Sequence, residues 1–132
     1  MLKNNFSPKQ AKIGVVVSVV LILILTVLEF PAPIGFETRP QAGVSPLWLI
    51  LFLAILVTEI AAIPLIFKKP KLGAKLAICA GVLNILQIFA DQLHLMQPEV
   101  APVFYTLLEL SVGVLSIALL YFALSLKGNR EK

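Results

Sequence analysis

The sequence predicts an all-α integral membrane protein: a single domain over residues 1–132, folded as a bundle of four transmembrane helices. The first observation is the composition: 59% of the residues are hydrophobic and only 14% are charged. A chain of this composition is too apolar for a soluble domain. The second is a set of apolar stretches near the roughly 20 residues that a helix needs to cross the hydrocarbon core. These stretches are residues 13–30, 46–67, 73–95 and 101–126.

The first two stretches are interpreted as membrane helices from their length and their ends. The first has too long an apolar core for a signal peptide, and the sequence after it, FPAPIGFE, lacks a cleavage site of small residues. Prolines and glycines then predict an irregular connection. The second helix is expected to begin at Pro46, a favourable first-turn residue, with Ser45 as its N-cap.

The distribution of basic residues is the third observation, and it predicts the orientation. Ten of the eleven Lys and Arg residues lie in the N-terminal tail, in the connection at residues 68–75 or in the C-terminal tail, and Arg39 alone lies on the other side. Cytoplasmic segments of membrane proteins carry this excess of positive charge. We therefore expect both termini in the cytoplasm, in the cytoplasmic (inner) membrane of a bacterium. The expected partner is the lipid bilayer, and no nucleic acid is expected.

The third stretch carries a polar stripe on an otherwise apolar helix. Its polar residues recur at intervals of three and four, which places them on one face at about 100° per residue. Unpaired polar groups in hydrocarbon cost several kcal/mol, so this face should point into the bundle, with the other helices packed around it. The polar residues are Asn84, Gln87, Asp91 and His94, and the small residues Gly73, Ala77, Ala80 and Gly81 continue the same face.

Two glutamates lie inside the predicted spans, Glu59 in the second and Glu109 in the fourth. A charge at the bilayer centre costs roughly 2.5–3.5 kcal/mol on insertion scales, so such residues usually face the bundle interior and are candidates for function. No Lys or Arg lies inside a predicted span beyond its first turn, where the third span carries Lys75. Burial without a counter-ion should therefore favour the neutral carboxyl.

Estimated depths along the helices bring these polar groups together in one pocket open to the external side. Such a pocket would bind or transport a proton, a cation or a small amphiphile such as a quinone, with Glu59 at its floor. Glu29 and His94 are predicted at its external gate. The predicted ligand or ion pocket consists of Glu59, Asn84, Gln87, Asp91 and Glu109.

Two other interpretations remain open. Neutral glutamic acids hydrogen-bonded to amides and hydroxyls would hold the helices together without any turnover. Alternatively, the polar stripes would dock the chain onto another membrane protein, as a non-catalytic accessory subunit of a larger, redox-linked complex or as a homo-oligomer. The direction of the stripes distinguishes a pocket within one chain from a docking surface.

The sequence gives little support to an enzyme and identifies no cofactor. It contains no nucleophile–base–acid set, no phosphate loop and no zinc motif, so no catalytic or metal-binding residue is predicted. Its one histidine, His94, cannot supply both axial ligands of a haem. Its one cysteine, Cys79, cannot form an internal disulfide.

The second half of the sequence resembles the DoxX-type small membrane proteins. In that family the second helix carries a glutamate, a short basic turn follows, and the third helix often ends with a histidine. Glu59, the basic turn and His94 occur here in that order, in the run TEIAAIPLIFKKPKLGAKLAICAGVLNILQIFADQLH. The resemblance implies a four-helix membrane protein, associated in some members with quinone-linked or redox partners. The first helix departs from the family pattern, since VLEFPAPIGFE replaces a Gly-x-x-Lys ending.

Overall fold

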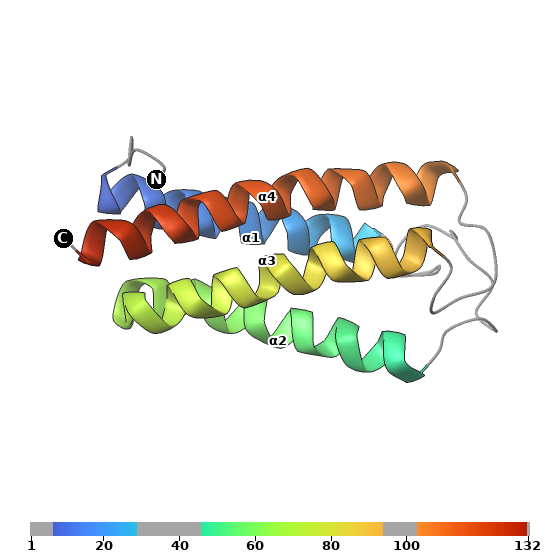
Figure 1. The fold of residues 1–132 in the computed structure, drawn as a ribbon, viewed down its shortest axis with the longest axis horizontal. Coiled ribbons are helices and arrows are strands. Elements are labelled where there is room, and N and C mark those ends of the chain that lie inside the picture. The colour runs from blue at the N-terminus through green and yellow to red at the C-terminus, as the bar shows by residue number, and fades with distance from the viewer. Residues whose placement is uncertain (1–6, 29–45, 94–102, 132) are drawn as a thin grey trace.

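The computed structural model describes residues 7–28, 46–93 and 103–131. These residues form four helices, shown in Figure 1, and each contains a stretch long and apolar enough to cross a membrane. The predicted all-α bundle of membrane helices is confirmed at this level. The helices are α1 Pro8–Leu28, α2 Pro46–Lys68, α3 Pro70–Gln92 and α4 Val103–Glu131.

A capping box explains why α1 begins at Pro8, five residues before the predicted start. The backbone N–H of Gln10 donates to Ser7 Oγ at 3.2 Å, and the backbone N–H of Ser7 donates to Gln10 Oε1 at 3.0 Å. These two bonds satisfy polar groups that the first helical turn leaves unpaired. Pro8 suits the first helical position, because its missing N–H has no partner there in any case.

A single residue, Lys69, separates α2 from α3. The N–H of Lys69 donates to the carbonyl oxygen of Leu65 at 2.8 Å, so the helical bonding of α2 continues up to the turn. Pro70 lacks an N–H and starts α3, in which Gly73 N–H donates to Lys69 O at 2.9 Å. The sequence placed the connection at residues 68–75 and the third span from residue 73, whereas the structure starts α3 at Pro70 and makes α2 and α3 antiparallel neighbours.

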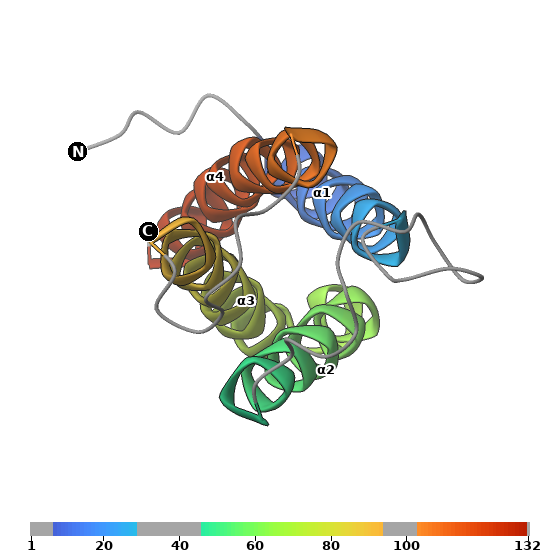
Figure 2. The same cartoon turned by 90° about the vertical axis from the view of Figure 1, so that its right-hand side faces the viewer.

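The helices alternate in direction, and α3 lies between α2 and α4. The N-terminal ends of α1 and α3 lie at one end of the bundle, together with the C-terminal ends of α2 and α4 (Figure 1). Figure 2 shows the helices around the bundle in the order α1, α4, α3, α2. Packing is extensive between α2 and α3, α1 and α4, and α3 and α4, whereas α1 and α2 pack least closely. The expectation that the other helices pack around the third holds for α2 and α4 but not for α1, which packs on α4 and less closely on α2.

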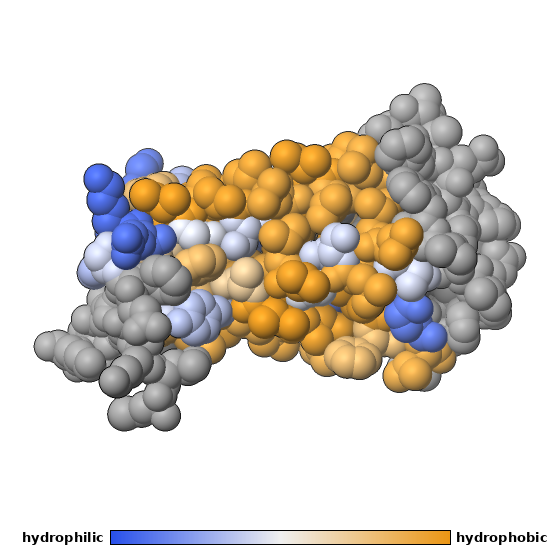
Figure 3. Space-filling view, turned by 90° about the horizontal axis from the view of Figure 1, so that it is seen from above, coloured by the Kyte–Doolittle hydropathy of each residue, from blue (hydrophilic) through white to orange (hydrophobic). Residues whose placement is uncertain are grey.

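The outside of the bundle carries large apolar side chains, and the helix contacts contain many small ones. Large Leu, Ile, Val and Phe side chains are exposed along all four helices, and Figure 3 shows a broad apolar band across one face. This distribution is typical of membrane bundles, in which small residues let helices approach closely while large apolar residues contact lipid. The fully buried alanines are Ala11, Ala62, Ala77, Ala80 and Ala123.

Gly73 of α3 packs directly against the backbone of α2. A Cβ atom here would lie 2.5 Å from the backbone nitrogen of Ile66 and 2.7 Å from the carbonyl carbon of Leu65. These are backbone atoms, so a side-chain rotation cannot relieve the clash and α3 would have to move away from α2. At Gly113, in contrast, an added Cβ would lie 3.5 Å from Ile88 Cδ1, an ordinary van der Waals distance.

We expect Gly73→Ala to destabilise the protein by about 1–3 kcal/mol, the usual effect of overpacking. Gly113→Ala is the matched control, and the higher helix propensity of alanine should leave it neutral or more stable by up to about 1 kcal/mol. Unfolding of the purified chain in mixed detergent micelles, followed by circular dichroism, measures both. Equal stability of the two variants would contradict the close approach at Gly73.

Candidate functional site

Two hydrogen bonds from amide side chains of α3 reach carboxyl groups on its two neighbours. Asn84 Nδ2 donates to Glu59 Oε1 of α2 at 2.7 Å. Eight residues along α3, Gln92 Nε2 donates to Glu109 Oε2 of α4. Each membrane glutamate is therefore held by an amide of the central helix, which binds α2 and α4 to α3.

The residues of the first bridge lie in the bundle interior. Glu59 is 0% exposed and Asn84 is 5% exposed. Glu109, which belongs to the second bridge, is 4% exposed. The predicted stripe on α3 is thus buried at Asn84, and the predicted faces of α2 and α4 are buried at their glutamates. Asn84, Glu59 and Glu109 therefore lie inside the bundle, as the pocket interpretation expects, and the docking interpretation stays a prediction for the part of the stripe outside the described side chains.

Several buried hydroxyl groups bond to their own helices. Thr26 Oγ1 donates to the carbonyl oxygen of Ile22 at 2.8 Å, and Ser116 Oγ donates to that of Val112 at 2.7 Å. A hydroxyl that donates to the preceding turn is satisfied without reaching another helix. In these two cases the donor does not join one helix to another.

The second carboxyl oxygen of Glu59, Oε2, is buried without a hydrogen-bond partner among the described residues. Leaving a buried polar atom unsatisfied costs about 1–3 kcal/mol, and more when the group is charged. Such an atom in a native structure calls for an explanation, and a bound water molecule or ion is one of the accepted explanations. Glu59 therefore has one oxygen fixed by Asn84 and one available for a further hydrogen bond.

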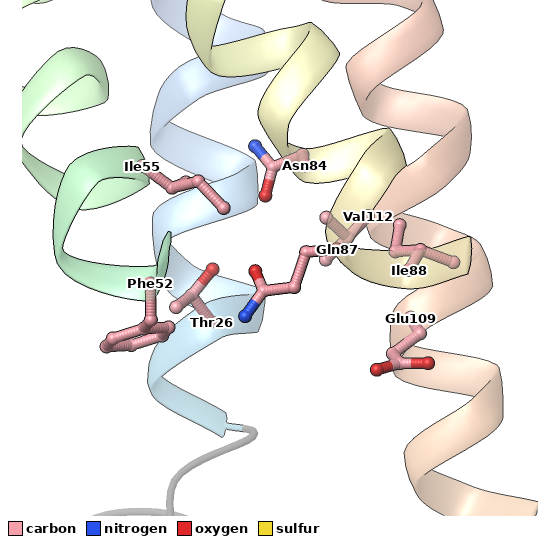
Figure 4. Close-up of a pocket in the computed structure, with 8 residues that line it drawn as sticks. All are labelled: Thr26, Phe52, Ile55, Asn84, Gln87, Ile88, Glu109 and Val112. Carbon is pink, nitrogen blue, oxygen red and sulfur yellow. The ribbon is translucent and has the colours of Figure 1, made fainter. Parts of the chain in front are cut away.

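A small cavity lies next to this pair, and its wall contains residues of all four helices (Figure 4). Asn84, Gln87 and Glu109 supply its polar groups together with Thr26. The volume is about 20 Å³, which is room for about one water molecule with polar partners. The complete lining is Thr26, Phe52, Ile55, Asn84, Gln87, Ile88, Glu109 and Val112.

Asn84 separates this cavity from Glu59. Asn84 lines the cavity and also donates to Glu59, whereas Glu59 is not part of the cavity wall. At 1.5 Å per residue, Glu109 lies about 9 Å from the start of α4, and Glu59 lies about 20 Å from the start of α2 at the same end of the bundle. Glu59 is thus the deeper carboxyl, as predicted, but it lies behind Asn84 rather than forming the cavity floor itself.

Three predicted residues cannot be placed in the site. Glu29 and His94 lie outside the described residues. Asp91 belongs to α3, but its side chain lies outside the part that the structure describes. Their assignment to the pocket or its gate stays a prediction. Within residues 7–28, 46–93 and 103–131, no group of three or more His, Cys, Asp or Glu is arranged to hold a metal ion.

Sequence reasoning missed two polar residues of the site, Thr26 and Gln92. Thr26 follows Ile22 by one helical turn on the buried face of α1, so helical periodicity could have found it. Gln92 falls about 80° from Asn84 around α3, which places it outside the single stripe that the sequence suggested. Since α3 contacts helices on two sides, it carries polar residues toward both α2 and α4.

Comparison with known proteins adds no relative: no family model, no curated protein and no solved structure matches the chain.

The bridge between Asn84 and Glu59 makes a testable contribution to stability. We expect Asn84→Leu to destabilise the protein by about 1–3 kcal/mol, because it removes the hydrogen bond that Glu59 makes in the interior. The double variant Glu59→Leu/Asn84→Leu removes both polar groups and should recover most of that loss. Unfolding in mixed micelles gives the coupling energy of the pair.

Ser111→Ala is the control for this cycle. Ser111 is exposed and donates to its own helix at Leu107 O, so its replacement should change stability by no more than about 0.5 kcal/mol. The cycle also needs the single variant Glu59→Leu. If the loss of stability in the double variant equals the sum of the losses in Glu59→Leu and Asn84→Leu, the two residues are not coupled and the bridge does not stabilise the protein as a unit.

Proposed function

We propose that this chain is a small membrane protein that binds and releases a proton at Glu59, through the cavity on the far side of Asn84. The observation that carries the proposal is the burial of Glu59 with one oxygen held by Asn84 and the other unpartnered among the described residues. Ionisable residues inside membrane spans usually face the bundle interior or a water-filled cavity and mark proton relays or ion pathways. The neighbouring cavity has room for about one water molecule.

The size of the cavity favours the proton over the larger candidates. Sites for drug-sized or cofactor-sized molecules usually have volumes of about 300–1,000 Å³, whereas this cavity has about 20 Å³. A quinone ring would require the helices to separate. A proton carried by water fits the cavity as it stands, and a small cation remains the second candidate from the same polar groups.

Asn84 is the proposed gate between the cavity and Glu59. Its amide nitrogen is held by Glu59, and its side chain also forms part of the cavity wall. Rotation of this side chain would let cavity water reach the unpartnered oxygen of Glu59. Glu109, closer to the end of the bundle where α2 and α4 begin, would relay protons between that end and the cavity.

Infrared difference titration of the purified chain in liposomes tests the proton-binding role. In the unaltered chain we expect a C=O band of a protonated carboxyl whose intensity changes with pH. This band should disappear in Glu59→Gln. In Glu109→Gln the band should persist, but its hydrogen–deuterium exchange should be slower. The control is Glu37→Gln, which removes a carboxyl outside the described helices and should leave the band intact. A band that does not titrate, in variants that are folded and equally stable, would make the carboxyls purely structural.

The same measurement separates a proton from a cation. If sodium shifts the Glu59 band at constant pH while choline does not, the site binds a cation and the proton assignment is wrong. If the band follows pH alone, the proton is the ligand.

We also propose that both termini lie in the cytoplasm, in the inner membrane of a bacterium. The bundle places the start of α1, the turn at Lys69 and the end of α4 at one end (Figure 1). The three basic segments of the sequence adjoin these positions, so their charges gather on one side, as the positive-inside rule requires of cytoplasmic segments.

Fusions to the C-terminus test this orientation. Green fluorescent protein fluoresces only when it folds in the cytoplasm, and alkaline phosphatase is active only outside it. We expect the green fluorescent protein fusion to fluoresce and the alkaline phosphatase fusion to be inactive. Replacing Lys68, Lys69, Lys71 and Lys75 with Gln should weaken this preference, and an active phosphatase fusion to the unaltered chain would reverse the proposed orientation.

A further inference from the structure

A second hollow lies at the opposite end of the bundle from the interior cavity, between the start of α1 and the end of α2. Its volume is about 620 Å³, and it is open to the surroundings. It occurs where the two least closely packed neighbouring helices meet. The lining residues are Ser7, Pro8, Lys9, Lys12, Ile13 and Phe67.

The hollow has an almost entirely apolar wall, and Lys9 and Lys12 are among the residues that line it. Phe67 is 56% exposed and Ile13 is 48% exposed, so each presents much of its side chain to whatever fills the space. Lys9 and Lys12 lie three residues apart on α1, on the same side of the helix. Their charged groups and the apolar wall together suit an amphiphile with an anionic head.

Positive charge dominates the surroundings of the hollow. Two described segments at this end, residues 7–13 and 67–75, contain six lysines and no Asp or Glu, and the end of α4 adds Lys127, Arg130 and Glu131. Basic pockets between membrane helices at such an end attract the head groups of anionic lipids. Next to the hollow, α1 and α2 carry exposed apolar side chains along the stretches that are long and apolar enough to cross a membrane.

We propose that this hollow binds one anionic phospholipid. The phosphate lies between Lys9 and Lys12, and an acyl chain follows Phe67 and Ile13 into the space between α1 and α2. A free phosphate ion would satisfy the lysines but would leave the apolar wall uncovered. A lipid satisfies both parts of the hollow and fills the poorly packed boundary between these two helices. The proposal does not depend on the proton-binding role of Glu59.

Quenching by brominated lipid tests the site directly. The reporter chain carries Phe67→Trp in the hollow and Trp48→Phe to remove the one natural tryptophan. It is placed in phosphatidylcholine vesicles with increasing fractions of brominated phosphatidylglycerol or, separately, brominated phosphatidylcholine. We expect brominated phosphatidylglycerol to reach half-maximal quenching at a lipid fraction roughly tenfold lower than the fraction of brominated phosphatidylcholine that gives the same quenching.

Two charge-matched variants locate the interaction. Lys9→Gln/Lys12→Gln removes two charges from the hollow and should abolish the preference for phosphatidylglycerol. Lys71→Gln/Lys75→Gln removes two charges from the same end of the bundle but outside the lining of the hollow. This variant should keep most of the preference for phosphatidylglycerol. Circular dichroism confirms that both variants are folded. Excess inorganic phosphate should not reverse the quenching.

Three results would overturn the proposal. Equal quenching by both lipids would show that the hollow does not select an anionic head group. An equal loss of preference in the two lysine variants would assign the attraction to the whole basic surface. Reversal of the quenching by inorganic phosphate would identify a simple anion site. Glu59→Gln in the reporter chain should leave the quenching unchanged, so this test succeeds or fails separately from the proton titration.

Discussion

The structure depends on one constraint: a polar group inside an apolar bundle must find its partner within the protein. Helix α3 supplies such partners to both membrane glutamates, with Asn84 bound to Glu59 of α2 and Gln92 bound to Glu109 of α4. The bond between Asn84 and Glu59 lies in the bundle interior, where little water competes for it, so it also fixes the relative position of two helices. The polar residues therefore help to determine the packing of the bundle.

Small residues complement this polar framework. Gly73 and Gly81 bring α3 into close contact with α2 and α4 respectively, and fully buried alanines continue these contacts. Close packing leaves a cavity of about 20 Å³ beside Asn84. The framework thus explains why the interior accommodates a water-sized ligand, whereas the least closely packed pair, α1 and α2, leaves the larger hollow at the basic end.

Much of the fold and part of the site could be predicted from the sequence. Length and hydropathy predicted the four helices, and the spacing of Asn84 from the small residues predicted the buried face of α3. The start of α1 could not be found in this way, because hydropathy marks where the chain becomes apolar whereas the capping box at Ser7 determines where the helix begins. Gln92 was missed because periodicity describes one face, whereas α3 contacts neighbours on two. The cavity volume depends on side-chain packing, which no periodic pattern contains.

The one-residue turn at Lys69 has a consequence for how the chain enters the membrane. It joins α2 and α3 into a helical hairpin, and the two members of the buried pair, Glu59 and Asn84, lie in that same hairpin. Such a hairpin forms through contacts close in sequence, with little loss of chain entropy in closing the turn. If the two helices insert together, the carboxyl meets its amide partner during insertion and need not cross the lipid alone. The turn therefore links the biogenesis of this protein to the same pair of residues that forms its candidate site.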